Sequence, residues 1–194
     1  YRDDAKWELR IPRGANRGAR PGDVVVAVAD AVRPARGRHG GRARVAPSAR
    51  VVEVLGPPGT PDADFRAIAW RHRLRREFPP DVLAAAAACS DALDPAEIAR
   101  RRDLRALPFV TIDPVTARDH DDAVCVEPAS RGRTRLWVAI ADVSHFVPEE
   151  GVLDREARLR GNSVYFPDRA IPMLPERLSG ELCSLRPDVD RLVL

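Results

Sequence analysis

Hydrophobic and polar residues alternate in short stretches over the first 56 positions of the chain. Residues 7–12 alternate, residues 22–28 contain a run of valine and alanine, and residues 50–56 contain a second valine-rich run. Gly, Asn and Pro residues between positions 14 and 21 are typical of turns. This part of the sequence therefore predicts short β-strands joined by turns, with one long loop before the last strand.

Between residues 57 and 100 the pattern changes to short helices. Residues 56–62 are rich in Pro and Gly, which indicates a boundary. A helix is expected over residues 81–89, because Pro79 and Pro80 suit a helix start and the alanine run that follows has high helix propensity. Asp94 is the expected N-cap of a further short helix that ends near Arg100. We expect this segment to connect two domains.

Strand and helix patterns are mixed in the second half of the chain. Residues 107–112 and 123–126 are predicted strands on either side of a polar stretch, and residues 135–143 are a predicted buried strand. A polar turn at 130–133 would join residues 123–127 and 135–143 into a hairpin. Beyond it we expect a charged helix at 154–160 ended by Gly161, a strand at 162–167 and a helix at 178–185.

The polar stretch between the first two of these strands carries four aspartates within ten residues: Asp113, Asp119, Asp121 and Asp122. Carboxylates this close repel one another unless a cation, arginines or water offset their charge. One interpretation is a site for Mg²⁺ or Mn²⁺, which prefer carboxylate oxygens and water. The alternative is a solvated turn in which aspartate serves as a turn former.

The long loop of the first segment is strongly basic. No acidic residue occurs from position 31 to position 50, whereas arginines occupy positions throughout the loop: Arg33, Arg36, Arg38, Arg42 and Arg44. Short strands with one long basic loop fit a partial β-barrel of the oligonucleotide-binding (OB) type. The loop would then follow a nucleic-acid backbone, and the alternative is a solvated basic linker.

Composition adds limits on the compartment and the completeness of the chain. The 194 residues carry a net charge of +3 and three widely spaced cysteines, Cys89, Cys125 and Cys183. Their spacing fits neither a metal site nor a redox pair, so a reducing compartment and a cytoplasmic location are expected. No apolar run reaches the length of a membrane span. The chain begins at Tyr1 without an initiator and ends within an apolar run, and we expect it to be part of a longer protein.

Several local motifs occur in one order over residues 100–191, and together they resemble the first half of the catalytic domain of the ribonuclease II and ribonuclease R exoribonucleases. The bacterial ribonuclease R branch is the most similar. The motifs are Arg102-Asp103-Leu104-Arg105, Thr111-Ile112-Asp113, Ala117-Arg118-Asp119-His120-Asp121-Asp122-Ala123-Val124, Ile140-Ala141-Asp142-Val143-Ser144, Arg160-Gly161-Asn162-Ser163-Val164-Tyr165, Ile171-Pro172-Met173-Leu174-Pro175 and Leu182-Cys183-Ser184-Leu185. Residues 52–56 and 77–80 are similar, more loosely, to the second cold-shock-type barrel of that family and its link to the catalytic domain.

The resemblance implies an α+β fold with three parts. Residues 1–56 would be a partial cold-shock or OB-type RNA-binding barrel, and residues 57–100 a connector with short helices. Residues 101–194 would be the N-terminal part of a mixed α/β ribonuclease II-type catalytic domain, truncated at its C-terminal side.

The implied activity is processive 3′ to 5′ hydrolysis of single-stranded RNA that releases nucleoside 5′-monophosphates with Mg²⁺. By position in the family motifs, Asp113, Asp119, Asp121 and Asp122 would be the metal-binding and catalytic carboxylates, with Asp121 the most critical. Tyr165 would position the last nucleotide, and Asp142 and His145 would shape the site through hydrogen bonds. His120 stands where the family usually has an apolar or aromatic residue.

Two further expectations concern activity. Groups that complete the site in this family would lie beyond Leu194, so the isolated chain is expected to cleave little RNA. The alternative function is an RNA-binding module of the same superfamily that has lost catalysis. The presence of all four aspartates favours the hydrolase.

Overall fold

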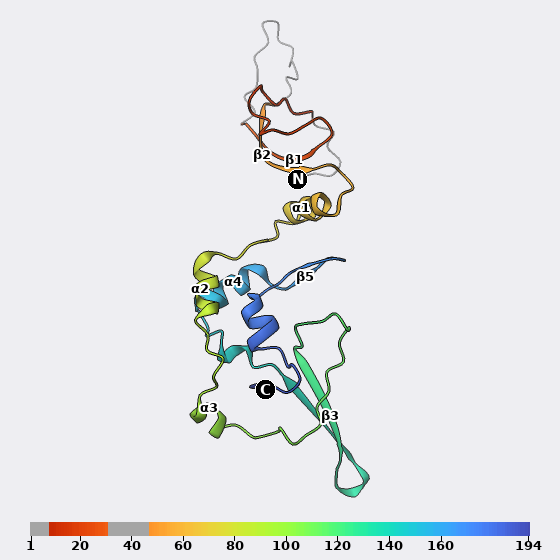
Figure 1. The fold of residues 1–194 in the computed structure, drawn as a ribbon, viewed down its shortest axis with the longest axis vertical. Coiled ribbons are helices and arrows are strands. Elements are labelled where there is room, and N and C mark those ends of the chain that lie inside the picture. The colour runs from red at the N-terminus through yellow and green to blue at the C-terminus, as the bar shows by residue number, and fades with distance from the viewer. Residues whose placement is uncertain (1–7, 31–46) are drawn as a thin grey trace, which may run out of the picture. The chain divides into compact units, whose positions relative to one another are not determined.

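The computed structural model describes residues 8–30 and 47–194 (Figure 1). The chain divides into two compact units, Tyr1–Arg76 and Glu77–Leu194. Both contain helices and strands, as the predicted α+β class requires. Within the described ranges, no helix is long and apolar enough to cross a membrane.

The first unit contains an antiparallel strand pair. Strand β1 (Val24–Ala29) pairs with β2 (Ala49–Gly56), and irregularities in the register lie between Val24 and Val25 and between Val26 and Ala27. Both strands were predicted. The predicted strand at residues 7–12 is wrong over its described part, where only a single bridge joins Arg10 to Ser48. Pro12 has no N–H to donate, and a turn begins directly after it.

Helix α1 (Pro61–Arg71) completes the described part of this unit. It packs against β2 and buries Ala63 and Ala69 on its inner face. Our sequence interpretation named no helix here, although Pro61 at the first position and Asp62 and Asp64 in the first turn are helix-start signals.

The second unit contains three α-helices and one π-helical segment. Helices α2 (Pro80–Ala87), α3 (Pro95–Ala99) and α4 (Val152–Arg160) confirm three predictions. Asp94 caps α3 by accepting a hydrogen bond from the Ala96 N–H at 2.8 Å. The helix predicted at 178–185 is instead a six-residue π-helical segment, η3 (Arg177–Leu182).

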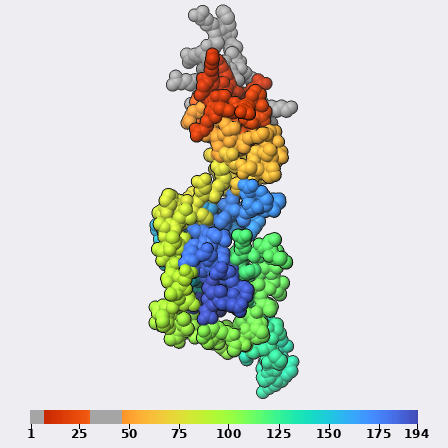
Figure 2. Space-filling view, viewed as in Figure 1, coloured from red at the N-terminus to blue at the C-terminus, as the bar shows by residue number. Residues whose placement is uncertain are grey.

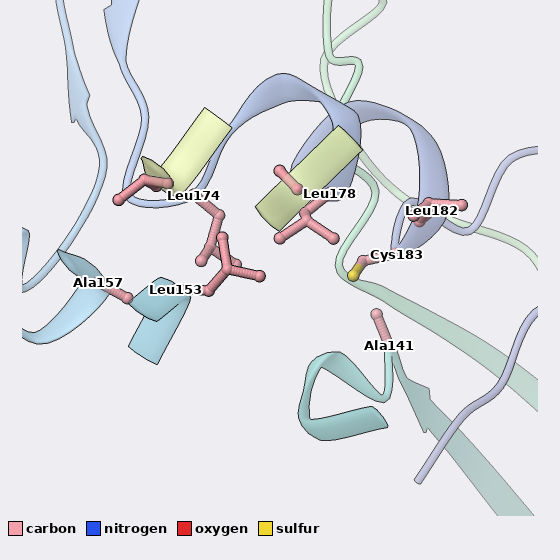
Figure 3. Packing of buried hydrophobic residues seen from close by; sticks show 9 residues of the cluster. Ala141, Leu153, Ala157, Leu174, Leu178, Leu182 and Cys183 are labelled. Atoms are coloured by element: carbon pink, nitrogen blue, oxygen red, sulfur yellow. The ribbon is translucent and has the colours of Figure 1, made fainter. Parts of the chain in front are cut away.

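The hydrophobic core of this unit lies where α2, α4 and η3 meet (Figure 3). Leu153 and Ala157 point from α4 toward Leu174 and Leu178, and Cys183 lies at the end of η3 near Ala141. Leu178 is fully buried. Burying a leucine contributes about 1.5–3 kcal/mol. The core therefore fixes the segment that leads from η3 into residue 184.

Strands β3 (Asp122–Pro128) and β4 (Thr134–Ile140) form the predicted hairpin, connected through the short turn η1 (Ser130–Gly132). The tip of the hairpin projects from its unit in the space-filling view (Figure 2). A second short turn, η2 (Val143–His145), follows β4. The strand predicted at 162–167 is confirmed only as β5 (Val164–Tyr165), which pairs with β6 (Ala170–Ile171).

Two strand predictions in this unit need correction. Residues 107–112 form no strand, because only Val110 bridges to Val124 and Ile112 is 86% exposed. The strand at 135–143 is not buried as expected: Leu136 and Val138 of β4 are exposed. An apolar run predicts a strand, but whether a second layer covers it depends on the tertiary structure.

Candidate functional site

The backbone of the acidic run is held by a buried serine that follows the π-helical segment. Ser184 is 0% exposed. Its hydroxyl donates to the carbonyl oxygen of Arg118 at 2.8 Å and accepts from the N–H of His120 at 3.1 Å. The Leu185 N–H also donates to the carbonyl oxygen of His120 at 2.9 Å. The backbone on both sides of Asp119 is therefore fixed from a segment more than 60 positions away.

The hairpin fixes the other end of the run. The carbonyl oxygen of Asp121 accepts a hydrogen bond from the Ala141 N–H at 2.9 Å, and Asp122 pairs with Ile140 as the first residue of β3. Val110 and Val124 exchange two backbone hydrogen bonds of 2.9 Å, which brings the chain that leads to Asp113 beside β3. Asp113, Asp119 and Asp121 thus lie on a loop, and Asp122 begins the strand that follows; hydrogen bonds anchor this segment at three places.

The side chains of these aspartates have different partners. An oxygen of Asp113 lies 3.1 Å from Nδ1 of His120, and the hydroxyl of Tyr165 donates to Asp119 at 2.9 Å. No side chain or backbone group of the described ranges donates a hydrogen bond to the carboxylates of Asp121 or Asp122. These two carboxylates retain their capacity to bind a cation.

The four carboxylates are close enough to affect one another. Partial removal of the Asp121 carboxyl from solvent raises its pKa, and the negative charges of Asp119, Asp122 and Asp113 raise it further. Like charges produce this effect when several carboxylates share one region. A divalent cation would offset that repulsion, and oxygen-only donors suit Mg²⁺ or Mn²⁺.

The side chains of the four aspartates do not together form a cation site in this structure. Within residues 8–30 and 47–194, no three His, Cys, Asp or Glu side chains are arranged to hold a metal ion. The donor chemistry fits a divalent ion, and the convergence of Asp113, Asp119, Asp121 and Asp122 on one remains a prediction. The solvated-turn alternative also stays open for the side chains.

A buried charge network supports the hairpin beside the acidic run. Asp142 is 4% exposed and lies 2.5 Å from Nη2 of Arg101, which also pairs with Glu97 of α3. The Ser144 hydroxyl donates to Asp142 at 2.6 Å. Burial acts to raise the pKa of Asp142, but the hydrogen bonds from Ser144 and Arg101 outweigh burial and keep its pKa below the ordinary value. Asp142 is thus a structural anion.

The remaining predicted site residues have different positions. Tyr165 is exposed at the end of β5. Its pKa is raised mainly by the hydrogen bond to Asp119 and, to a smaller extent, by partial burial. The five loop arginines, Arg33, Arg36, Arg38, Arg42 and Arg44, lie outside the described residues. His145 stacks edge-on against the ring of Phe146.

Sequence reasoning assigned no role to Ser184 or Arg101. Ser184 stands in one of the motifs given above, where its small polar side chain between leucine and cysteine was the available signal.

Cys183, the preceding residue, has its pKa raised to about 11 by burial and by the charge of Asp121. The core and the acidic run are therefore adjacent through residues 183 and 184.

Two family models match the chain. An RNB domain model matches residues 101–194, and a cold shock domain model matches residues 3–79. Ribonuclease R of Vibrio cholerae is 45% identical over 99% of this chain and 23% of its own length. Ribonuclease R of Escherichia coli is 46% identical over 99% of this chain and 23% of its own length. The chain thus spans less than a quarter of these curated relatives.

Solved structures similar to this chain also include ribonuclease R. Mycoplasma genitalium RNase R in complex with double-stranded RNA has a TM-score of 0.83 and 31% identity, over 97% of this chain and 32% of that one. The complex of the same enzyme with ribose-methylated single-stranded RNA has a TM-score of 0.82. Yeast Ssd1, a pseudonuclease, has a TM-score of 0.63 at 21% identity, which shows a shared fold alone. These comparisons confirm the predicted fold class, a cold-shock OB-type part followed by the start of an RNB domain.

Proposed function

Because the chain belongs to the ribonuclease II and ribonuclease R family of exoribonucleases, we propose that it carries the acidic cleavage site of an RNA hydrolase. The reaction is processive 3′ to 5′ hydrolysis of single-stranded RNA, with release of nucleoside 5′-monophosphates and with Mg²⁺ as the cofactor. Mn²⁺ is the alternative ion, since it prefers the same oxygen donors.

The observation that carries this proposal is the grouping of charge around Asp121. Its carboxyl lies within the field of Asp119, Asp122 and Asp113, and its pKa is raised by partial burial and by those charges. These residues would hold Mg²⁺. The bound ion would offset the negative charge that develops on the phosphodiester oxygens during attack. It would also lower the pKa of the attacking water, which makes hydroxide more readily available.

The remaining roles belong to the protein's own groups. Ser184 and the Ala141 N–H hold the backbone of the acidic run. Tyr165, with its hydroxyl on Asp119, would place the last nucleotide of the RNA beside the carboxylates. Stacking of a base on an aromatic ring is tolerant of sequence, as a nuclease that accepts every base requires.

Replacement of Asp121 by Asn in the protein at the full length of its relatives tests the proposal. RNA binding should persist while release of mononucleotides falls by at least about 10²-fold, since removal of one stabilising group typically costs that much. Asp188→Asn is the matched control, because Asp188 is exposed and its positive φ of +60° suits asparagine. Unchanged cleavage by Asp121→Asn would contradict the metal assignment.

An RNA-binding module without catalysis is the second candidate. The match of a cold shock domain model to residues 3–79 supports the RNA-binding part of this candidate. The two candidates separate in the same assay, because a module without catalysis binds single-stranded RNA and releases no mononucleotides from the unaltered full-length protein. We further propose that the 194-residue chain alone cleaves little, since it spans 23% of the Vibrio and Escherichia relatives.

Two further parts of the proposal concern organisation and location. We propose the division into a barrel at 1–56, a connector at 57–100 and a catalytic part at 101–194. We also propose a cytoplasmic location, which the three free cysteines support.

A further inference from the structure

A pocket of about 260 Å³ lies at the C-terminal end of α1, in the first unit, whereas the acidic run belongs to the second. Its lining combines two apolar side chains with an aromatic ring and two arginines: Ala69, Leu74, Trp70, Arg73 and Arg76. Trp70 is 45% exposed, which is unusual for a tryptophan of a folded unit. None of these residues was assigned a role by the family motifs.

The backbone at the end of α1 builds this pocket. The Leu74 N–H donates to the carbonyl oxygen of Ala69 at 2.8 Å, and the Arg73 N–H donates to that of Trp70 at 3.1 Å. These two bonds define a Schellman motif, which turns the chain back over the last helical turn. Arg73 adopts the left-handed conformation, with φ of +55°, at the position that glycine normally takes. An arginine is therefore held at the pocket in a backbone conformation that is unfavourable for it.

A hydrogen bond to strand β2 fixes the ring of Trp70. Its Nε1–H donates to Glu53 of β2, and the same carboxylate accepts from Arg66 at 2.5 Å and from Arg76 at 3.2 Å. No guanidinium or aromatic ring of the described ranges covers Trp70. An ordered aromatic ring with an accessible face is suited to stacking.

Trp137 of the second unit has the same kind of anchor as Trp70, but two arginines lie over its ring. Its Nε1–H also donates to a glutamate, Glu127, at 3.0 Å. Its ring, however, is covered by the guanidinium of Arg102 at 4.7 Å and that of Arg135 at 5.5 Å from the centroid. Trp137 is thus anchored in the same way but has its stacking surface occupied by cations.

The lining of the pocket carries two arginines and no acidic residue. From residue 65 to residue 76 the chain has five arginines and no acidic residue. The single charge of Glu53 is shared between Arg66 and Arg76, and Arg73 forms no ion pair with any residue in the described ranges. Arg73 is therefore available for a phosphate.

We propose that this pocket is a nucleotide subsite for single-stranded RNA, in which a base stacks on Trp70 and the adjacent phosphate pairs with Arg73. The inference rests on the proposed function for the identity of the nucleic acid. It assigns an RNA-binding role in the first unit to residues other than the loop arginines and the aspartates of the acidic run. The stacking is independent of base identity.

Binding of a 3′-fluorescein-labelled oligoadenylate to the 194-residue chain, followed by anisotropy in EDTA, tests the subsite. Trp70→Ala should weaken binding by roughly 5- to 100-fold, the range expected for loss of one stacked base. Trp70→Phe should keep the affinity but remove the part of the tryptophan fluorescence that RNA quenches. Trp137→Phe, the matched control, should leave both the affinity and that quenched part unchanged.

Arg73→Gly provides an independent arm. Glycine adopts the left-handed conformation without cost, so this variant keeps the helix end and removes only the cation. The slope of log affinity against log salt should fall in magnitude by about 0.7, as expected when one phosphate of a single strand is no longer neutralised.

The outcomes separate the subsite from the proposed function. Tight binding by the unaltered chain together with unchanged affinity of Trp70→Ala, or an unchanged salt slope of Arg73→Gly, overturns the subsite and leaves the hydrolase intact. Loss of mononucleotide release in full-length Asp121→Asn would still support the hydrolase in that case. No RNA binding by the unaltered chain overturns the subsite and removes its support for RNA as the substrate.

Discussion

The buried hydroxyl of Ser184 accepts a hydrogen bond from the backbone N–H of His120 at 3.1 Å, across 64 positions of sequence. Because the same hydroxyl donates to the carbonyl oxygen of Arg118, one side chain holds both peptide groups that flank Asp119. The orientation of the acidic run therefore depends on a residue that carries no charge.

Replacement of Ser184 by Ala should disturb this run. It leaves the part-buried N–H of His120 without its side-chain partner, and an unsatisfied donor away from water typically costs about 1–3 kcal/mol of unfolding free energy. Cleavage by the full-length protein should fall roughly 10- to 100-fold, as for other residues that orient metal ligands. Raising the Mn²⁺ concentration should restore part of the loss, and a rate that does not respond to Mn²⁺ would indicate a purely structural role.

Ser179→Ala is the matched control for that measurement. Among the residues that the structure describes, the hydroxyl of Ser179 has one hydrogen-bond partner, the carbonyl oxygen of Pro175 at 3.5 Å, four positions earlier. Its removal should change neither the unfolding free energy nor the Mn²⁺ dependence appreciably.

The role of Tyr165 is separable into its ring and its hydroxyl. Tyr165→Ala should weaken the binding of single-stranded RNA by roughly 1–3 kcal/mol, because the stacking ring is removed. Tyr165→Phe should retain that affinity while it frees Asp119 from its hydrogen bond. Titration of both full-length variants with RNA in EDTA checks this, and equal losses in the two would show that the hydroxyl, not the ring, holds the RNA.

Asp142 should determine part of the acid stability. Its pKa in the folded protein lies below the ordinary value of 3.8, because hydrogen bonds from Ser144 and Arg101 outweigh the effect of burial. A lowered pKa stabilises the fold above the unfolded-state pKa, and this stability is lost as the pH falls through the folded-state pKa.

Asp142→Asn should therefore lower the unfolding free energy at neutral pH by roughly 1.5–3 kcal/mol, the value of hydrogen bonds to a charged group. The difference from the unaltered chain should shrink as the pH falls below about 4. Urea unfolding at a series of pH values measures it. Asp188→Asn, at an exposed position, should change stability little at any pH. A pH-independent deficit for Asp142→Asn would show that packing, not charge, is responsible.

The basic loop should account for part of the salt dependence of RNA binding. Replacing Arg36 and Arg38 by Gln should reduce the magnitude of the salt slope by about 0.7 for each phosphate that is no longer neutralised. Arg158→Gln is the control, because Arg158 is already paired with Asp154 on the surface of α4. If the loop replacements leave the slope of log affinity against log salt unchanged, residues 33–44 are a linker that does not contact RNA.

The sequence by itself determined the elements whose signals are local. The valine-rich runs specified β1 and β2, alanine and proline specified α2, and Asp94 and Gly161 marked where α3 begins and α4 ends. Each of these depends on propensity or on a cap within a few residues. The order of motifs likewise identified the family, which the comparisons confirm.

Only the tertiary structure decided which runs are covered and what holds the acidic residues. Residues 107–112 have a strand composition but find only one bridge, and β4 has an exposed apolar face. Ser184, Arg101 and the Trp70 pocket depend on interactions between distant residues, or on the reversal of the chain after α1. Such interactions leave no periodic signal, because they join single positions and repeat in no pattern along the chain.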